Sequence, residues 1–459
     1  MRQSAGKKAS SDRKRLYIQT LGCQMNVNDS DKIVTLLRDE GYEPTDAAED
    51  ADLILINTCS IREKAAQKAF SQLGRFRMLK ERNPGLVLAV AGCLAQQYGQ
   101  KILSRAPFVD IVFGTHNIHG LPEFIRRVEK NGSRVVETAF TPAVQSLSMT
   151  AMPVNGAVGA YVTIMQGCNN FCAYCVVPHL RGPEESRPAG DILAEIAGLA
   201  DHGVREVTLL GQNVNAYGKT TEGGPRFPQL LRSIGRIRGI ERIRFTTSHP
   251  KDLSEELMRC FAEVESLCGH IHLPVQSGSD AILRSMNRGY TRDQYLEKIK
   301  GLRHYCPEIS ITSDVIVGFP GETEADHQAT LALMEAVKFD NLFSFKYSER
   351  EGTRAVGFDR QVPEKVKAER LQQLQALQQE HTLVRNRMLE GSLQDVLVEG
   401  KSKNSDYDMT GRTGSNKIVN FRGGPGLAGR TCPILIKKAY LHSLRGEMAG
   451  GEEQPCSSK

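Results

Sequence analysis

The octapeptide Cys168-Asn169-Asn170-Phe171-Cys172-Ala173-Tyr174-Cys175 follows the segment Met165-Gln166-Gly167 near the middle of the chain. Three of its residues are cysteines, whose thiolates can bind three irons of a 4Fe-4S cluster. Because such clusters normally have four thiolate ligands, the fourth iron is left without a protein ligand. We therefore expect the chemistry of this protein at an open iron site.

The cysteine spacing C-x3-C-x2-C resembles the signature of the radical S-adenosylmethionine (SAM) superfamily. The resemblance implies that the amino and carboxylate groups of SAM chelate the open iron. It also implies that an electron from the cluster cleaves SAM to methionine and a 5′-deoxyadenosyl radical. The alternative is a zinc site of the Cys3His type, with His179 as the fourth ligand.

Length and composition set the limits of this interpretation. A chain of 459 residues is long enough for about two to four domains. Its net charge of +6 permits an RNA partner without requiring one. Eleven cysteines, with no signal peptide and no apolar run that could span a bilayer, predict a cytoplasmic protein without a membrane partner.

Three further cysteines share a position just beyond an apolar strand and just before a helix. The strands are expected at 16–21, 52–56 and 86–91, and the cysteines that follow them are Cys23, Cys59 and Cys93. Alternating strands and helices predict a doubly wound parallel sheet, which binds ligands at the carboxyl ends of its strands. We expect the three thiols to share a metal centre there, although a single cysteine in such a place is more often a small buried apolar residue.

The other cysteines show no such pattern, and we assign them no role. They are Cys260, Cys268, Cys306, Cys432 and Cys456.

The central region predicts a partial barrel. Six strands alternate with helical segments, and they are expected at 161–165, 206–210, 242–247, 270–274, 310–317 and 342–347. This order is typical of an open (β/α)6 barrel, in which the functional residues gather at the carboxyl ends of the strands.

Polar and glycine-rich segments follow these strands and suit a SAM pocket. We expect Gln212, Gln276 and Ser277 to line it, the alternative being turn formation and helix capping. His249 and His272 are expected to be packed or hydrogen-bonded rather than metal ligands, because no second ligand accompanies either at a suitable spacing. The radical chemistry that the resemblance implies requires no acid-base pair among the catalytic groups.

The C-terminal region predicts a long helix at 362–390, with an apolar stripe that includes Leu374 and Val384, and then five short strands. The strands, at 395–400, 408–412, 417–421, 431–438 and 439–444, indicate a small β-barrel. Basic and aromatic side chains suited to RNA are frequent in it: Lys401, Lys403, Arg412, Lys417, Arg422, Arg430, Lys437, Lys438, Tyr407 and Phe421. A solvated surface is the alternative, because acidic residues offset part of this charge.

Four motifs together resemble the methylthiotransferase family of radical SAM enzymes. They are Gly22-Cys23-Gln24-Met25-Asn26 with Asp29-Ser30, Asn57-Thr58-Cys59, Ala91-Gly92-Cys93 and residues 165–187. Residues 411–421 resemble the TRAM domain, an RNA-binding barrel. The resemblance implies an α/β protein of several domains: a methylthiotransferase N-terminal domain (14–130), a linker (131–153), a radical SAM core (154–384) and a TRAM barrel (387–449). The composition of the two ends predicts a disordered basic tail (1–13) and a disordered tail (450–459).

The resemblance also implies the function. Cys168, Cys172 and Cys175 would hold the radical-generating 4Fe-4S cluster, and Cys23, Cys59 and Cys93 an auxiliary 4Fe-4S cluster. Two SAM molecules would be used to place a methylthio group on N6-isopentenyladenosine 37, in the anticodon stem-loop of tRNA. The implied electron donor is a flavodoxin or a ferredoxin, and we expect a monomer.

Two other functions remain open at this point. One is methylthiolation of threonylcarbamoyl-adenosine in tRNA or of a ribosomal-protein aspartate, since relatives with those substrates have similar frameworks. The other, from a different class, is an RNA-binding protein whose cysteines form structural metal sites.

Overall fold

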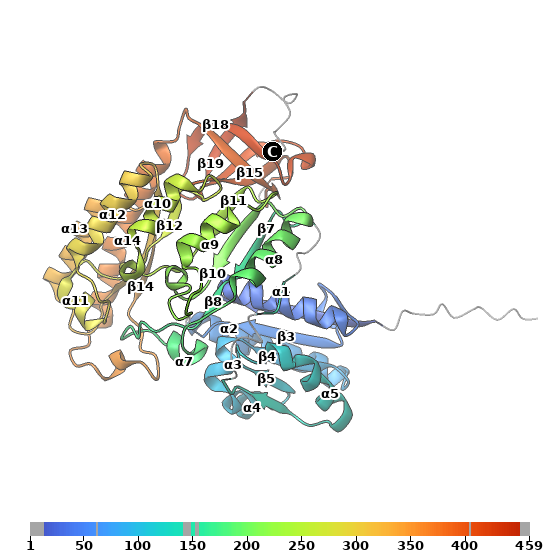
Figure 1. Ribbon diagram of the computed structural model, residues 1–459. Coiled ribbons are helices and arrows are strands. Elements are labelled where there is room, and N and C mark those ends of the chain that lie inside the picture. The colour runs from blue at the N-terminus through green and yellow to red at the C-terminus, as the bar shows by residue number, and fades with distance from the viewer. Residues whose placement is uncertain (1–12, 61–62, 141–147, 152–155, 404, 450–459) are drawn as a thin grey trace, which may run out of the picture. The chain divides into compact units, whose positions relative to one another are not determined.

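The computed structural model describes residues 13–60, 63–140, 148–151, 156–403 and 405–449. The chain divides into two compact units, residues 1–152 and 153–459 (Figure 1). The first unit is built on a six-stranded parallel sheet of order β2-β1-β3-β4-β5-β6. Its strands are β1 (Lys14–Leu21), β2 (Tyr42–Pro44), β3 (Leu53–Thr58), β4 (Val87–Ala91), β5 (Ile111–Phe113) and β6 (Val135–Glu137).

Helices cover both faces of this sheet. They are α1 (Gln24–Asp39), α2 (Glu63–Arg82), α3 (Cys93–Tyr98), α4 (Gln100–Arg105) and α5 (Leu121–Asn131). In β3, Leu53 and Leu55 belong to the apolar cluster that includes α1 and α5. Ile54 and Ile56 belong to the cluster that includes α2, α3 and α4. Because successive strand residues point to opposite faces, β3 contributes to both cores, and the predicted doubly wound sheet is confirmed.

The second unit begins with six parallel strands in two sheets, β7-β10-β11 and β12-β13-β14. A single bridge between Ile243 and Leu267 links the two sheets. The strands are β7 (Gly159–Thr163), β10 (Glu206–Leu210), β11 (Arg242–Phe245), β12 (His270–His272), β13 (Ser310–Val317) and β14 (Asn341–Lys346). Neighbouring strands follow one another along the chain, as predicted for an open (β/α)6 barrel.

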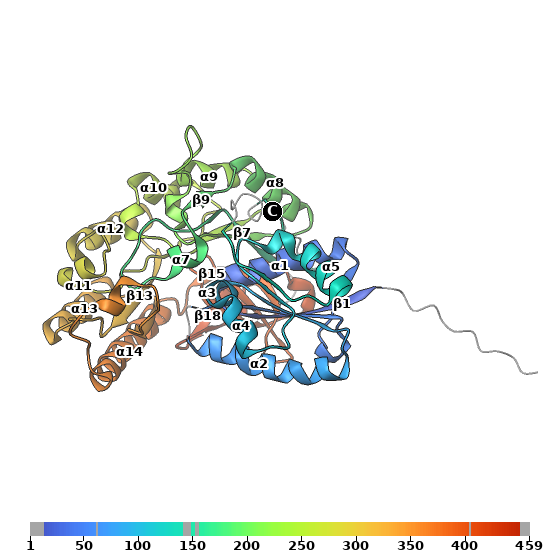
Figure 2. The ribbon, with the colours of Figure 1, turned by 90° about the horizontal axis from the view of Figure 1, so that it is seen from below.

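The helices of the barrel form an arc outside the strands (Figure 2). They are α8 (Ala189–Asp201), α9 (Phe227–Ile234), α10 (Glu255–Glu263), α11 (Asp280–Ser285), α12 (Arg292–Tyr305), α13 (Glu324–Val337) and α14 (Glu364–Arg387). Local sequence fixes where several of them begin. The hydroxyl of Thr291 accepts a hydrogen bond from the Gln294 amide, and that of Thr323 accepts one from the Asp326 amide. Such caps satisfy amides that have no partner within the helix.

The long helix α14 buries a mostly polar face, and the predicted apolar stripe is wrong at one end. Leu374 is buried, but Val384 is exposed. Gln378 donates a hydrogen bond to the Phe339 carbonyl and Thr382 donates one to the Asp340 carbonyl. The helix therefore packs beside β14 through hydrogen bonds to its start, a pattern that apolar periodicity does not reveal.

The C-terminal part of the second unit is a closed five-stranded barrel of order β15-β16-β17-β19-β18. Its strands are β15 (Leu393–Lys401), β16 (Asp408–Thr413), β17 (Ile418–Arg422), β18 (Thr431–Ala439) and β19 (Leu444–Met448). The small β-barrel is confirmed, but the fifth strand begins at Leu444 rather than at the predicted residue 439. Residues 440–443 connect β18 to β19.

The loop between β16 and β17 is fixed to strands of the partial barrel. Arg244 of β11 donates to the carbonyls of Thr413 and Gly414 at 2.8 and 3.0 Å, and its Nε lies 2.8 Å from Glu206. At the last strand of the partial barrel, Lys417 of the same loop lies 2.9 Å from Asp340, which immediately precedes β14. The same loop thus contacts the third and sixth strands through buried charges.

This contact predicts that the small barrel depends on Arg244 for its place. An Arg244→Met variant leaves Glu206 partly buried without its cation and two carbonyls without donors, so the free energy of unfolding should fall by about 3–5 kcal/mol. Urea unfolding and limited proteolysis would measure this.

Arg412→Ala is the matched control, because it removes a side chain that pairs with the half-exposed Glu399. The substitution leaves the backbone carbonyl of residue 412 in place. Its cost should stay below about 1 kcal/mol. Equal losses in the two variants would contradict the assigned role of Arg244.

Candidate functional site

The cysteine triplet follows β8 (Met165–Gln166), which pairs with β9 (Glu185–Ser186). Gly167 has a φ of 80°, and a side chain there would meet the Pro183 carbonyl at 1.8 Å, so only glycine fits. The Gly167 amide donates to Gln212 at 2.6 Å, and the Cys168 amide donates to the Gly182 carbonyl at 3.2 Å. The start of the loop is therefore held between two other segments.

The three thiols are close enough to affect one another. Burial raises the pKa of Cys168, with a smaller contribution from Cys172. Burial, and then the neighbouring Cys172, raises the pKa of Cys175 to about 12. Three partly buried thiols that repel each other as thiolates fit a site for a cation-rich group, because bound iron removes both penalties. The donor set thus matches an iron–sulfur cluster.

The middle of the loop is held by the segments that follow β12 and β14. The Ala173 amide donates to the Met286 carbonyl, and the Ala355 amide donates to the Ala173 carbonyl, both at 2.9 Å. Asn287 donates to the Phe171 carbonyl at 3.1 Å. Phe171 itself has a φ of 42° and an exposed ring. The loop is therefore rigidly supported although it contains no regular secondary structure at its centre.

The three residues predicted to line a SAM pocket lie at strand ends in different surroundings. Gln212 accepts the Gly167 amide and so supports the cysteine loop. Ser277 is fully buried, and its hydroxyl accepts the Ser279 amide at 3.2 Å, which matches the alternative of turn formation. Gln276 has a φ of 75°, and its buried side-chain oxygen has no hydrogen-bond partner within the described structure. It is the one of the three with a free acceptor.

The two histidines are hydrogen-bonded, as predicted. His249 accepts the Lys251 amide at 3.2 Å, and burial lowers its pKa to about 2, so the ring is neutral. His272 lies 3.0 Å from the Thr312 hydroxyl and 3.4 Å from Asp314. Within the described ranges, no three His, Cys, Asp or Glu side chains are grouped tightly enough to hold a single metal ion.

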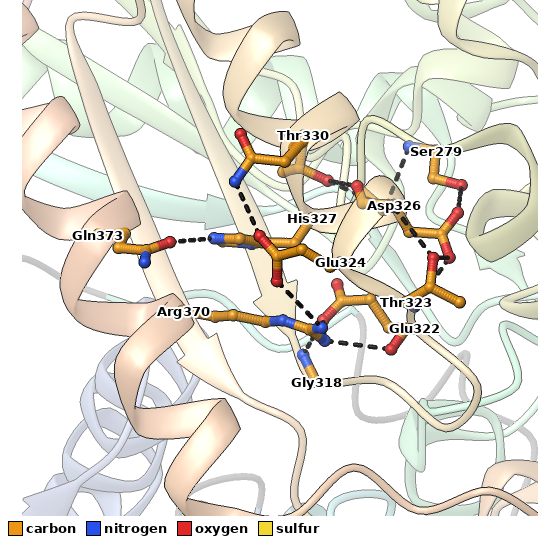
Figure 3. Close-up of polar contacts among 12 residues, drawn as sticks. Ser279, Gly318, Glu322, Thr323, Glu324, Asp326, His327, Thr330, Arg370 and Gln373 are labelled. Carbon is orange, nitrogen blue, oxygen red and sulfur yellow. Dashed lines mark hydrogen bonds and ion pairs between the residues drawn. The ribbon is translucent and has the colours of Figure 1, made fainter.

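A buried ion pair supports the loop after β13 (Figure 3). One oxygen of Glu322 accepts the Gly318 amide at 2.6 Å and Arg370 of α14 at 2.8 Å. Nearby, Asp326 accepts hydrogen bonds from Thr323 and from Ser279, the cap of α11. The network therefore joins the loop 318–323 to three helices, beside the strand end that carries Gln276.

In the first unit, the predicted strand-end cysteines meet at one edge of the sheet. Leu21 of β1 pairs with Thr58 of β3, and Asn57 of β3 pairs with Ala91 of β4. Cys23, Cys59 and Cys93 each follow within two residues of these paired ends. Adjacent strands lie about 4.8 Å apart, so in-register ends bring the three cysteines together. Cys23 is exposed, whereas the other two are buried.

Two asparagines of the quoted motifs, to which the sequence alone gave no role, join α1 to β3 at this edge. Asn57 donates to the Asn26 carbonyl at 2.8 Å and to the Ser30 hydroxyl at 3.0 Å, and Asn26 donates to the Asn57 side chain at 3.0 Å. The side-chain oxygen of Asn26 also lies 3.3 Å from the Cys23 sulfur. The signal that could have found Asn57 is a fully buried amide in an otherwise apolar strand. The edge is thus preorganised to present thiols.

Comparison with known families matches three regions of the chain. Residues 15–114 match the uncharacterized protein family UPF0004, residues 162–334 the radical SAM superfamily, and residues 387–449 the TRAM domain. A tRNA-2-methylthio-N(6)-dimethylallyladenosine synthase of Syntrophus aciditrophicus is 60% identical over 446 residues, which cover 97% of both chains. The chain belongs to this synthase family. A synthase of the same name from Geobacter sulfurreducens is 53% identical over 95% of this chain and 98% of its own.

Solved structures outside the synthase family share the fold. The radical SAM methyltransferase TsrM of Kitasatospora setae, with tryptophan and a SAM analogue bound, superposes with a TM-score of 0.55 at 14% identity over 72% of both chains. The cobalamin-dependent SAM radical enzyme OxsB gives a TM-score of 0.51 at 12% identity, over 80% of this chain and 56% of its own. Among the described residues, no helix has the length and apolar character needed to cross a bilayer.

The buried pair of Glu322 and Arg370 yields a prediction for this synthase. An Arg370→Met variant leaves Glu322 charged and buried, and the free energy of unfolding should fall by about 3–5 kcal/mol in urea titrations.

Glu324→Ala is the control, because Glu324 is exposed and lies 3.5 Å from the same arginine. Its effect should be no more than about 1 kcal/mol. A small loss in the Arg370 variant would show that the loop 318–323 does not depend on this pair.

Proposed function

We propose that this chain places a methylthio group on C2 of the adenine in N6-isopentenyladenosine 37 of tRNA. The observation that carries the proposal is near-complete alignment at 60% identity with a synthase of that modification. Two separate sets of three cysteines support it: Cys23, Cys59 and Cys93 follow three neighbouring parallel strands, and Cys168, Cys172 and Cys175 share the loop that follows β7 and β8. As a member of the radical SAM superfamily, the chain uses SAM and a 4Fe-4S cluster.

In this proposal the two cysteine sets have different roles. Cys168, Cys172 and Cys175 hold the cluster that binds SAM, and Cys23, Cys59 and Cys93 hold a second 4Fe-4S cluster. When bound, these groups supply a carbon-centred radical from one SAM and a methylated sulfur from another. The C2–H bond of adenine is not acidic enough for a general base, so no side chain is needed to remove that hydrogen as a proton.

The residues of the chain orient and shield these groups. Gly167 and Gln212 fix the start of the cysteine loop, so that the thiols are arranged before iron binds. The unpartnered oxygen of Gln276 can accept a hydrogen bond from SAM at a strand end, where polar groups in a closed site fix ligand orientation. The Ser277 hydroxyl, 3.3 Å from that of Thr330, holds the segment that carries Gln276 against α13. Glu322 and Arg370 hold the next loop in place.

The TRAM barrel is the proposed tRNA-binding part, with fewer contact residues than predicted. Phe421 is fully buried in the barrel core, and Lys417 is paired with Asp340, so neither is available to RNA. Tyr407 and Tyr440 are exposed, and the Lys438 ammonium lies 5.5 Å from the centre of the Tyr440 ring. An exposed aromatic beside a cation suits base stacking and phosphate contact together.

The remaining partners follow from the chemistry. Reductive cleavage of SAM needs a low-potential electron donor, and we propose a flavodoxin or a ferredoxin. We also propose a cytoplasmic monomer with no membrane partner. The target base must leave its stack to reach the strand ends of the barrel.

The substrate is tested by anaerobic turnover on three candidates side by side. They are isopentenylated tRNA, threonylcarbamoylated tRNA and the ribosomal protein with its target aspartate. Mass spectrometry should find the methylthio product on the first substrate only. Product on either of the others would redirect the assignment within the methylthiotransferases, and a colourless zinc-containing protein would replace the enzyme with an RNA-binding protein.

The division of roles predicts the effect of Cys93→Ala. This variant should still cleave SAM to 5′-deoxyadenosine under reducing conditions, yet form no methylthio product, because only the second cluster is lost.

Cys260→Ala is its control, since the Cys260 thiol is buried against the Pro228 carbonyl at 3.8 Å, far along the sequence from both sets. Its product formation should match the wild type. Normal product from the Cys93 variant would refute the auxiliary role.

The RNA surface predicts that Tyr440→Ala weakens tRNA binding by about 1–3 kcal/mol if a base stacks on the ring. Filter binding or fluorescence anisotropy at fixed salt would measure it. Tyr440→Phe, which keeps the ring, should bind as the wild type does. Equal affinity of all three proteins would place the RNA on another face of the barrel.

A further inference from the structure

Arg288 is a buried guanidinium beside the cysteine triplet. Only 4% of the residue is exposed. It lies in the segment between α11 and α12, and its Nη2 donates to the Pro274 carbonyl at 2.6 Å. Its Nε donates to the Tyr290 hydroxyl at 3.0 Å, and its Nη1 lies 3.3 Å from both the Cys172 sulfur and the Tyr174 hydroxyl. One face of the guanidinium is thus anchored to the barrel, and the other meets a cysteine of the triplet.

This cation has no carboxylate partner among the described residues. Three other arginines with buried side chains do have one: Arg187 pairs with Glu195, Arg244 with Glu206 and Arg370 with Glu322. The buried Arg242 instead donates to two backbone carbonyls of the small barrel. A buried charge without a counter-ion is strongly unfavourable, so proteins pair such groups or use them to bind an ion of opposite sign. The contact partners of Arg288 are a carbonyl, two phenols and a thiol. Of these partners, the thiol is the one that becomes negatively charged when it binds a metal.

An iron–sulfur cluster on Cys168, Cys172 and Cys175 would supply that charge. Three thiolates outweigh the positive charge of the oxidised iron–sulfur core, and reduction adds one more negative charge. Hydrogen bonds and charges near the sulfurs are among the factors that set the reduction potential of such clusters. A guanidinium fixed 3.3 Å from a ligand sulfur therefore favours the reduced state over the oxidised one.

We propose that Arg288 is the built-in counter-charge of the SAM-binding cluster, which it holds through Cys172 and whose reduction it favours. This positioning role rests on the proposed function, because it requires the cluster on this triplet. It explains why a full positive charge is buried where a neutral donor could have made the same hydrogen bonds to Pro274 and Tyr290.

A purely structural role is the competing explanation. In that case Arg288 joins the Pro274 carbonyl to Tyr290 and the loop, and its charge is incidental. Lys251 offers a comparison, because its ammonium also reaches the cysteine loop, at 2.6 Å from the Asn170 side chain, but is exposed. Water and salt screen an exposed cation much more than a buried one.

The test uses the full-length protein with Cys93→Ala, so that only the cluster on the triplet is present. An anaerobic redox titration followed by electron paramagnetic resonance measures the reduction of that cluster. Arg288→Gln, Arg288→Lys and Lys251→Gln are compared in that background, together with their iron contents. We expect the glutamine variant at 288 to have a more negative midpoint potential, or to lose its iron. The lysine variant should keep its iron and most of the potential, and Lys251→Gln should shift little.

The cluster assignment and the counter-charge of Arg288 fail under different results. No cluster signal in the parent with Arg288 intact would mean that the cluster assignment itself fails. If the parent shows the signal, unchanged potential and iron in Arg288→Gln would overturn the counter-charge. Loss of iron in both Arg288→Gln and Arg288→Lys would also overturn it, and so would equal midpoint potentials in these two variants. In either case the positive charge that lysine retains would have no effect.

Discussion

Three thiolates held close together repel one another, so a fold that binds a cluster through three cysteines must oppose that cost. In the second unit, burial and the nearness of Cys172 raise the pKa of Cys175 to about 12, so its thiolate does not form at neutral pH without a positive partner. A scaffold must hold the sulfurs close before the metal arrives, and the metal then favours the thiolate form. The carboxyl ends of parallel strands provide such a scaffold, because every loop that leaves them begins from a fixed position.

The two units meet this constraint in different ways. The first takes one cysteine from each of three neighbouring strands, where hydrogen bonds between Asn26 and Asn57 join the start of α1 to the end of β3. The second takes all three from one loop, which depends on neighbours for its shape: Gln212 at its start, and Asn287 and Met286 at its middle. Contacts from several strand ends thus replace regular secondary structure in the loop.

Much of this could be predicted from sequence, for a physical reason. Apolar segments that alternate with helical ones predicted the six strands of the partial barrel, because local propensity and burial agree there. The strands β2, β5 and β6, of three residues each, are too short to show a period, and they were not anticipated. The long-range partners of polar groups were also missed. Lys417 was expected to face RNA and instead pairs with Asp340, and Arg288 had no local signal that linked it to Cys172.

The central claim is that one chain carries two 4Fe-4S clusters, each with one iron that has no cysteine ligand. One cluster lies on a loop and the other on a sheet edge. Mössbauer spectroscopy on anaerobically prepared full-length protein with enriched iron, together with iron and zinc analysis, tests it most directly. The account predicts two 4Fe-4S clusters and about eight irons per chain. About four irons, or zinc in place of iron at either set of cysteines, would contradict it.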